Sequence, residues 1–474
     1  MEGVNDFIVT MTIWVPTLSG EGPRYRQLAT AIGRAIESRE LGPGTRLPPQ
    51  RRLAHALGVT VGTITRAYGE AERQGWVEAR VGSGTYVRGG RESPGFSHVS
   101  VTRENDGWID LSLAMPPGDA ERDAGLRRAL AGIQADPTAL AHALDYQPEG
   151  GLDAHRNIYA RWMTELGLPV DADELIIDQG GMNGIFIALC TLAGPGRRVA
   201  AERLTYPGLI SVAGQLGQRL VALDHDADGL AVDTLAARHD QQPFDVLYVM
   251  PEHQNPTTAR LDEARRAALA AFAREREVWI VEDGVQHLPA AERGTPLYRL
   301  APERTVYLFS VSKILSGGLR SGAMRVPAAI RERVSAAVRN ISWMPPPLIA
   351  SVVGHWIASG DADRVRTRQF DELAARAAMT RAALSGFDLR LRAGGFYAWL
   401  ELPPGQRAAR VVERLAAERI KVNAAEAFCV GSEAAPQAIR ICFSAARDRA
   451  ALADALARIR GVVASPELQA WQTI

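Results

Sequence analysis

The chain has 474 residues, which exceeds the size of one ordinary domain, so two or three folding units are expected. Its composition, 46% apolar and 23% charged, is that of a globular protein, and no apolar run reaches the roughly 18 residues of a membrane-spanning helix. The first residues lack the basic start, apolar core and cleavage site of a signal peptide, which predicts a cytoplasmic protein. The three cysteines, Cys190, Cys429 and Cys442, have no metal-binding spacing, which predicts reduced thiols and no metal site.

The net charge of zero conceals an uneven distribution along the chain. Residues 23–91 carry 12 arginines against 5 glutamates and no lysine or aspartate, hence +7, which leaves −7 on the remainder. A basic part joined to an acidic remainder indicates that the basic part meets a polyanion, of which nucleic acid is the usual one.

Lysine is almost absent, because only Lys313 and Lys421 occur and the other 52 of the 54 basic residues are arginine. A lysine side chain can lose its proton and form a Schiff base, which a guanidinium cannot do. Lys421 precedes an apolar run and is expected at the surface, so Lys313 is the candidate reactive amine. The alternative interpretation is that the two lysines were retained by chance and that neither has a chemical role.

The basic part begins, after an N-terminal arm over residues 1–22, with a helical stripe of apolar residues between Tyr25 and Arg39. A Gly-Pro-Gly turn ends this helix, and a second helix is expected from about Arg51 to Gly58. Thr60 is a suitable N-cap for a third helix. Residues 76–88 then have the pattern of a strand, a glycine turn and a second strand, which is the order of a winged helix-turn-helix. A small helical subdomain that binds nothing is the alternative.

The sequence from Tyr25 to Val87 resembles the GntR-type winged helix over its whole length. We therefore predict a winged helix-turn-helix domain over residues 23–90 that binds double-stranded DNA. The resemblance implies DNA contacts from the arginine after the Leu-Pro turn, the start of the third helix and the wing, namely Arg51, Thr60, Thr63, Thr65 and Gly82. Val61 stands just after the helix cap, where an arginine is common in the GntR family. This departure from the family pattern affects the residues available to read DNA bases.

A linker rich in glycine, serine, arginine and glutamate is predicted over residues 91–109, ahead of a large body over residues 110–474. In the body, short β-branched runs alternate with longer helical patterns such as Leu261–Arg276. The candidate strands are ELIIDQ, RRVAAE, RLVALD, DVLYVMPE, VWIVEDG, TVYLFSVS and GAMRVP. This alternation predicts an α/β fold with a mostly parallel sheet.

Polar residues follow several of these candidate strands, where ligands of α/β sheets bind. A helix opens at Gly180–Asn183, and Asn255, Asp283, Lys313 and Arg320 stand at or beyond other strand ends. Singly, Asp283 could be a helix cap, Asn255 part of a turn and Arg320 a surface charge. Together they supply what an aldehyde cofactor needs: an amine, a carboxylate for a pyridine nitrogen, and cations and N–H groups for a phosphate.

The body resembles fold-type I aminotransferases, since SVSKILSGGLRSG is similar to their SxSKxxxPGLRxG segment. With the basic part in front, the chain from about Trp14 to its C-terminus resembles the MocR (GabR-like) regulators. The resemblance implies a large subdomain over about 150–340, a small one over about 345–474, and pyridoxal 5'-phosphate as the cofactor. It further implies that Lys313 forms the internal aldimine and is the catalytic residue.

The same resemblance assigns roles to other residues of the cofactor site. It implies phosphate contacts from Ser310, Ser312, Arg320 and the N–H groups of Gly181 and Met182, with Asp283 on the pyridine nitrogen, Asn255 on the ring hydroxyl and Tyr206 stacked on the ring. Arg440 would clamp the carboxylate of an amino acid. Tyr146 would reach the phosphate of a neighbouring subunit, so a homodimer is expected. Trp343, Met344 and Pro345 are candidates for one wall of the substrate pocket.

Two departures from the aminotransferase pattern bear on turnover. In the family a tyrosine hydrogen-bonds the cofactor ring, and here Val285 and Gln286 stand where it is expected. The second departure is Thr258, which replaces the glycine that follows Asn-Pro-Thr in the family. Loss of the phenol removes a group that tunes the reactivity of the cofactor imine. These changes weaken the prediction of efficient transamination.

Three functions remain open at this point. The first is a transcriptional regulator that binds DNA through its winged helix and senses an amino acid or amine through external aldimine formation. The second is an active aminotransferase with an autoregulatory or vestigial DNA-binding part. The third is a regulator that has lost the cofactor and binds another ligand. Exchange of the DNA-binding parts between the two protomers is a further possibility for the dimer.

Overall fold

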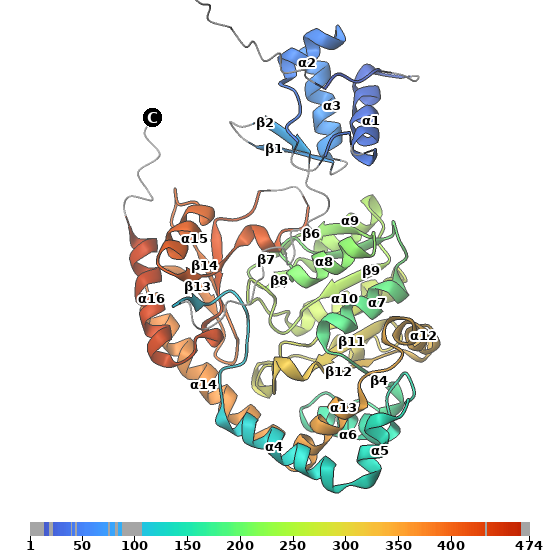
Figure 1. Ribbon diagram of the computed structural model, residues 1–474, viewed down its shortest axis with the longest axis vertical. Coiled ribbons are helices and arrows are strands. Elements are labelled where there is room, and N and C mark those ends of the chain that lie inside the picture. The colour runs from blue at the N-terminus through green and yellow to red at the C-terminus, as the bar shows by residue number, and fades with distance from the viewer. Residues whose placement is uncertain are drawn as a thin grey trace, which may run out of the picture. The chain divides into compact units, whose positions relative to one another are not determined.

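The computed structural model describes residues 14–18, 22–38, 40–42, 45–73, 76–80, 84–87, 107–431 and 434–465. The chain divides into two compact units, residues 1–92 and 93–474, drawn in Figure 1. Each unit has its own hydrophobic core, and no helix in the described ranges combines the length and the apolar character needed to cross a membrane.

The N-terminal unit consists of three helices and a hairpin, in the order that the sequence predicts. Its elements are α1 (Arg24–Glu37), α2 (Gln50–Leu57), α3 (Val61–Arg73), β1 (Val77–Arg80) and β2 (Gly84–Val87). The strands pair antiparallel, and the helices bury a shared core that includes Leu28, Leu53 and Ile64. The unit is therefore a winged helix-turn-helix, as predicted.

Two capping interactions fix the turn between α2 and α3. Gly58 ends α2 with a left-handed backbone, φ 63°, which a residue with a Cβ adopts only at a cost. Thr60 then precedes α3, and its Oγ1 accepts a hydrogen bond from the N–H of Thr63 at 3.2 Å. The predicted N-cap is thus confirmed, and its hydroxyl sets where the third helix begins.

The C-terminal unit is built on a seven-stranded sheet in which all seven candidate strands occur. They are β4 (Leu175–Asp178), β5 (Arg198–Glu202), β6 (Arg219–Leu223), β9 (Val246–Val249), β10 (Trp279–Asp283), β11 (Thr305–Ser310) and β12 (Gly322–Arg325). Their order is β4-β12-β11-β10-β9-β5-β6, and β12 alone in this sheet runs antiparallel to its neighbours. The predicted α/β fold with a mostly parallel sheet is confirmed.

Helices cover both faces of this sheet, which explains why its strands are apolar without alternation. Along β4, Ile176 packs with α7 (Gly181–Leu192), α8 (Pro207–Gln215) and α12 (Arg331–Ser342) on one face. The adjacent Leu175 and Ile177 contribute to the core of the opposite face. The helices of that face are α6 (Asp153–Glu165), α10 (Glu263–Glu275), α11 (Leu297–Leu300) and α13 (Pro347–Ala358).

A second, antiparallel sheet follows near the C-terminus, in the order β13-β14-β17-β16. Its first two strands are labelled in Figure 1. Its strands are β13 (Asp388–Leu391), β14 (Ala398–Glu401), β16 (Asn423–Ala424) and β17 (Ala438–Ile441), and it packs with α14 (Asp361–Ala383), α15 (Ala408–Ala417) and α16 (Arg449–Ala464). Separately, β3 (Ile109–Asp110) pairs parallel with β15 (Ile420–Lys421). The first strand of the unit is therefore joined to its last third.

The remaining elements lie at the periphery of the same unit. They are α4 (Ala120–Ala135), α5 (Pro137–Leu144), α9 (Leu235–Gln241) and the short strands β7 (His225–Asp226) and β8 (Gly229–Leu230). Helix α4 packs against α5 and α13. These helices extend the layer that covers the second face of the large sheet.

A test of the N-terminal core concerns Gly33 on α1, since a Cβ at this position would lie 2.7 Å from the Trp76 ring. The variant Gly33→Val is expected to lower the free energy of unfolding of this unit by about 1–3 kcal/mol, because the ring must move. Calorimetry of the full chain would show a shift in one transition only. Gly69→Ala on α3 is the control, since nothing lies within 4 Å of its Cβ position and helix propensity favours alanine. An unshifted transition in Gly33→Val would contradict this packing.

Candidate functional site

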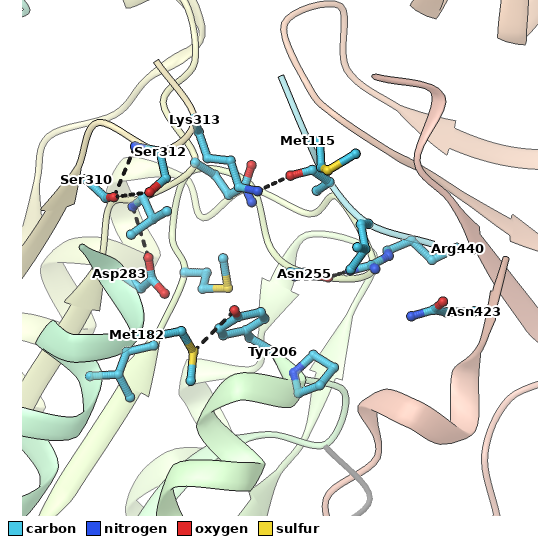
Figure 2. Close-up of a pocket in the computed structure, with 18 of the residues that line it drawn as sticks. Met115, Met182, Tyr206, Asn255, Asp283, Ser310, Ser312, Lys313, Asn423 and Arg440 are labelled. Atoms are coloured by element: carbon cyan, nitrogen blue, oxygen red, sulfur yellow. Dashed lines mark hydrogen bonds between the residues drawn. The ribbon is translucent and has the colours of Figure 1, made fainter. Parts of the chain in front are cut away.

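A cavity of about 230 Å³ opens at the carboxyl ends of the parallel strands (Figure 2). Ten predicted site residues line it: Gly181, Met182, Tyr206, Asn255, Asp283, Ser310, Ser312, Lys313, Arg320 and Arg440. They come from the start of α7 after β4, from the ends of β10 and β11, from the segments that follow β5, β9 and β11, and from β17. The topology explains this convergence, because parallel strands end at a common edge of the sheet.

Lys313 follows β11 and extends into the cavity (Figure 2). Its Nζ donates a hydrogen bond to the carbonyl of Ala114, and Gln369 of α14 donates to its backbone carbonyl at 2.6 Å. Burial, helped by the nearby cations Arg440 and Arg320 and opposed by Cys442 and Asp283, lowers the pKa of Lys313 to about 8. A larger share of this amine is therefore neutral near pH 8 than of an ordinary lysine, which makes it a better nucleophile.

Asp283 ends β10 and presents a carboxylate to the same cavity. Tyr248 of β9 donates its hydroxyl to Oδ2 at 2.5 Å, and the N–H of Val285 donates to Oδ1 at 2.9 Å. Burial raises the pKa of Asp283, while these two hydrogen bonds and the charge of Lys313 oppose the rise. The site thus holds the carboxylate in a fixed orientation, where a protonated ring nitrogen would stabilise its ionised form.

Donors for an anion gather between the start of α7 and the end of β11. In the described part of the chain, the N–H groups of Gly181 and Met182 in the first turn of α7 have no hydrogen-bond partner. Ser312 Oγ accepts from Arg320 Nη1 at 3.2 Å and from Ser310 Oγ at 3.0 Å. A helix N-terminus, two hydroxyls and a guanidinium are a suitable set for a phosphate.

Two glycines keep this anion site open. Gly180 has φ 87°, and a Cβ there would lie 3.2 Å from Nη2 of Arg320. Gly322, at the start of β12, is paired with both Asp178 and Ser310, and a Cβ there would lie 2.6 Å from Oδ1 of Asp178. A side chain at Gly180 would press on Arg320, and one at Gly322 would collide with Asp178 and the Phe309 carbonyl, so either would disturb the loops that carry these donors.

Tyr206 and Met182 form an apolar floor of the cavity (Figure 2). The Tyr206 hydroxyl lies 3.4 Å from the sulfur of Met182, and a Cβ at Gly208 would overlap both side chains. Burial raises the pKa of Tyr206, so this phenol is protonated at neutral pH. The ring is therefore held in place as a neutral surface on which another ring could stack.

Arg440 of β17 is a buried cation, 5% exposed, at the other side of the cavity. Its Nη1 donates to Asn255 Oδ1 at 2.7 Å, and its Nη2 donates to the carbonyl of Ser112 at 2.5 Å. The guanidinium also lies 4.7 Å from the centroid of the Phe428 ring. Because these acceptors are neutral and no described carboxylate forms an ion pair with Arg440, a carboxylate of a ligand is a natural partner for it.

Val285 and Gln286, at the position of the replaced tyrosine, both line the cavity. A Cβ at Gly181 would lie 2.7 Å from Val285 Cγ2, so this side chain packs directly over the first turn of α7. Gln286 is 6% exposed, and among the described residues its Oε1 has no hydrogen-bond partner. The site therefore offers an amide and a methyl group at the place where a phenol is expected.

Other expected residues are not part of the cavity. Tyr146 is 81% exposed, and its ring lies 5.8 Å from that of Trp343, which is 58% exposed. Trp343, Met344 and Pro345 do not line the cavity within one chain. The expected contact of Tyr146 with a neighbouring subunit stays a prediction. Lys421 was expected at the surface, but its side chain is only 23% exposed and lies 3.7 Å from Asp110.

Four of the five expected DNA contacts lie in the described part of the N-terminal unit. Arg51, Thr60 and Thr65 are exposed, and Thr63 is half-buried. Thr65 Oγ1 donates to Gln50 Oε1 at 2.7 Å, which ties α3 to the start of α2. Val61 is 42% exposed at the first position of α3. Gly82 lies outside the described residues.

Sequence reasoning missed several groups that contact the expected ones. Tyr248 orients Asp283, Gln369 holds the backbone of Lys313, and Asn423 lines the cavity beside Arg440. The signal that could have identified Tyr248 was a tyrosine within the apolar run VLYVMP. The carbonyls of Ser112 and Ala114 carry no signal, because every residue has a carbonyl.

Two families match the sequence, one for each unit. "Bacterial regulatory proteins, gntR family" matches residues 24–87, and "Aminotransferase class I and II" matches residues 108–459. The HTH-type transcriptional regulator TauR of Rhodobacter capsulatus is 27% identical over 478 residues, which cover 93% of this chain and 96% of that protein. The uncharacterized HTH-type transcriptional regulator YdeF of Bacillus subtilis is 26% identical, with 92% of this chain and 94% of that protein covered.

Solved structures of aminotransferases share the fold of the body. An archaeal alanine:glyoxylate aminotransferase superposes with a TM-score of 0.69 at 20% identity, covering 75% of this chain and 90% of that chain. LysN, an alpha-aminoadipate aminotransferase from Thermus thermophilus, gives a TM-score of 0.67 at 23% identity, with 76% and 92% covered. At these identities the likeness establishes the fold of the body and no activity.

The lowered pKa of Lys313 predicts a distinct pH dependence of acylation. Because only the neutral amine reacts, the rate for Lys313 in cofactor-free protein is expected to rise with pH up to about 8 and then to level off. An ordinary lysine, with a pKa of about 10.4, would continue to gain reactivity up to pH 10. Acetic anhydride labelling followed by peptide mass spectrometry would measure this, with Lys421 as the internal reference. A rate for Lys313 that rises without a plateau to pH 10 would contradict the assignment.

Proposed function

Because the chain belongs to the aminotransferase class I and II family over residues 108–459 and carries a gntR-family domain ahead of it, we propose that it is a transcription regulator that depends on pyridoxal phosphate. In this proposal the N-terminal unit binds operator DNA in the cytoplasm. The body binds the cofactor and an amino compound, the effector. The observation that carries the proposal is the single cavity that combines Lys313, Asp283, Arg320 and Arg440 in a chain whose full-length relatives are named transcriptional regulators.

The residues of the cavity fit pyridoxal phosphate. The free N–H groups of α7 and the hydroxyls beside Arg320 suit its phosphate, and Gly180 and Gly322 keep that space clear. Asp283 would face the ring nitrogen, Asn255 the ring hydroxyl, and Tyr206 the ring face. The bound cofactor would supply an aldehyde that condenses with primary amines. This fit speaks against a regulator that has lost the cofactor.

Several side chains of the cavity would each make a different contribution to binding the effector. Lys313, with its lowered pKa, supplies a neutral amine and can hold or release a proton at Nζ. Tyr248 keeps Asp283 oriented, and burial excludes water from both. Arg440 would bind a carboxylate of the effector through two N–H groups. An amino acid therefore fits the cavity better than a simple amine.

An active aminotransferase with an autoregulatory or vestigial DNA-binding unit is the second candidate, because Lys313 and Arg440 suit either function. Two observations favour the regulator. Val285 and Gln286 line the cavity where a phenol is expected, so a group that tunes the cofactor is replaced by an amide and a methyl group. The relatives that cover more than nine tenths of the chain are named transcriptional regulators.

DNA binding is proposed for the exposed side of the helix-turn-helix. The N-terminal residues of the second helix of this motif contact base edges in the major groove, and this helix is α3 here. Thr60, Thr63, Thr65 and Arg51 would contact phosphates or bases, as would Gly82 in the wing. Val61 offers a methyl surface rather than a guanidinium, which suits the methyl group of thymine rather than guanine.

A homodimer is proposed as the assembly. Large apolar side chains are exposed on neighbouring helices of the body, namely Leu126, Leu130, Leu140, Leu144, Tyr146, Ile341, Trp343 and Leu348. They belong to α4, α5, α12, α13 and the loops beside them. A group of exposed apolar side chains on adjacent elements is typical of a protein–protein interface. A second copy of the chain is the occupant we propose, with Tyr146 reaching its phosphate site, and exchange of the DNA-binding units stays a prediction. A monomeric mass in light scattering would contradict the dimer.

The cofactor assignment predicts a visible absorption band in protein loaded with pyridoxal phosphate. Lys313→Ala is expected to abolish this band, because no other amine of the described chain lines the cavity. Lys421→Arg is the matched control and is expected to retain it. A colourless wild-type protein that takes up no pyridoxal phosphate would contradict the proposal. When amino acids are added, a shifted band that holds steady supports a sensor, whereas steady conversion to the amine form of the cofactor supports an aminotransferase.

The DNA assignment predicts that Arg51→Ala weakens binding to a duplex selected by the wild-type protein from a random library. The expected loss is about 1–3 kcal/mol of binding free energy, since an arginine that holds a base or a phosphate is removed. Fluorescence anisotropy at fixed salt would measure it. Arg447→Ala, an exposed arginine of the body, is the control with the same change of charge. Equal affinities of the Arg51→Ala and Arg447→Ala proteins would contradict the assignment.

A further inference from the structure

Asp178 is a buried carboxyl group to which the proposed function gives no role. It ends β4 and is 2% exposed. Its Oδ1 accepts a hydrogen bond from the N–H of Gly180 at 2.7 Å. Its Oδ2 has no hydrogen-bond partner among the described residues. Because a buried carboxylate oxygen without a donor is costly, this environment favours the neutral form of Asp178.

The carboxyl group lies between the first turn of α7 and the start of β12. A Cβ at Gly184 would lie 2.9 Å from Oδ2, and a Cβ at Gly322 would lie 2.6 Å from Oδ1. The same point at Gly184 also faces the side chains of Leu308 and Met324. Asp178 is therefore enclosed by the backbone of two elements and by apolar side chains of the sheet.

Two side chains of the described residues act on this carboxyl group as charged or titratable neighbours. Arg320, in the segment before β12, lowers the pKa of Asp178, and the hydrogen bond from Gly180 acts in the same direction. Tyr159 of α6 shares a hydrogen bond with the Ser321 hydroxyl at 2.7 Å, and burial raises its pKa, so it stays neutral. Burial outweighs both opposing effects and raises the pKa of Asp178 to about 7. Its charge therefore changes near neutral pH.

The positive groups near Asp178 are those of the proposed phosphate site. The first turn of α7 carries the free N–H groups, and Arg320 acts on Asp178 while it donates to Ser312. Across the sheet, Asp178 pairs with Gly322, and Gly322 pairs with Ser310. Paired residues of neighbouring strands point to the same face. Asp178 and the Ser310 hydroxyl therefore lie on one face, with their Cα atoms about 10 Å apart and only a glycine between them.

A bound phosphate and an ionised Asp178 would depend on the same positive groups. A phosphate monoester is a dianion above about pH 6. Like charges this close in a buried site raise the affinity of the weaker acid for a proton. When Asp178 is neutral, the repulsion is absent, and Arg320 and the start of α7 act on the phosphate alone.

We propose that Asp178 takes up a proton when a phosphate group binds between α7 and Arg320, so that the site binds the phosphate and the proton together. The ligand class is the dianionic phosphate monoester. Since the ionised form of Asp178 opposes binding, phosphate binding weakens as the pH rises above neutral. This inference rests on the proposed function, because it places the phosphate of pyridoxal phosphate at this site. It adds that cofactor loading depends on pH through a residue that does not line the cavity.

Calorimetric titration of the full-length, cofactor-free protein with pyridoxine 5'-phosphate tests this. The probe carries the ring and the phosphate but no aldehyde, so it forms no imine with Lys313. Asp178→Asn is neutral at every pH. We expect its affinity to equal that of the wild type near about pH 6 and to be about tenfold higher near about pH 9, since one pKa unit of coupling is tenfold. The ratio of the two affinities removes the contribution of Lys313, which loses its proton in the same range in both proteins.

Proton uptake is the second readout. Titrations at about pH 7.5 in two buffers with different heats of ionisation count the protons, and the wild type is expected to take up about half a proton more than Asp178→Asn. Asp454→Asn removes an exposed carboxylate that pairs with Arg458 on α16, and this control is expected to match the wild type. Asp178→Ser is a second neutral variant, which serves if Asp178→Asn destabilises the protein.

The outcomes separate this inference from the proposed function. A ratio of affinities that stays constant with pH, or equal proton uptake, would overturn the role of Asp178 and leave the cofactor site intact. Weaker binding by both neutral variants at every pH would also overturn it, because Asp178 would then support the loops without exchanging a proton. A wild-type protein that binds neither pyridoxine phosphate nor pyridoxal phosphate would contradict the proposed function and, with it, this inference.

Discussion

The structure of the body depends on one constraint, the meeting of parallel strand ends at a single edge of the sheet. Asp283 ends one strand, Lys313 follows the next, and Gly181 opens a helix after a third, so groups from distant parts of the chain line one cavity. Burial at this edge raises the pKa of the carboxyl and lowers that of the amine, and each partly offsets the shift of the other. A bound ligand of complementary charge would offset more of the cost of burying these charges.

Much of this could be predicted from the sequence, for physical reasons. The seven strands of the large sheet are buried on both faces, so they stand out as apolar runs, and their polar ends mark the site residues. The helix caps of the N-terminal unit could also be predicted. Thr60 caps a helix through its side chain, and Gly58 adopts a left-handed backbone that other residues disfavour. The short strands of the second sheet and β3 were not predicted, because two to four residues carry little periodicity, and the contacts of Ser112 and Ala114 were missed because they are made by backbone carbonyls. The surface position predicted for Lys421 was wrong, because its partner Asp110 lies some 300 positions away in the sequence.

Arg440 is the group of the cavity that suits the carboxylate of a ligand. Arg440 is 5% exposed and donates to two neutral acceptors, Asn255 and the Ser112 carbonyl, and its Nε has no hydrogen-bond partner among the described residues, so it is placed to bind a carboxylate. An enzyme could use the same arginine to hold substrate. What differs here is that a unit matching the gntR family precedes the body along the chain. The replacement of a phenol by Val285 and Gln286 is consistent with a site that binds without efficient turnover.

The central claim is a free-energy coupling between amino acid binding in the body and DNA binding by the N-terminal unit. Its most direct test is the affinity of the full-length, cofactor-loaded protein for a selected duplex, measured by anisotropy without and with a saturating amino acid. We expect the dissociation constant to change by about 5- to 150-fold, and the affinity for the amino acid to change by the same factor when DNA is bound. Superimposable binding curves, with the absorption band showing that the site is full, would contradict the account.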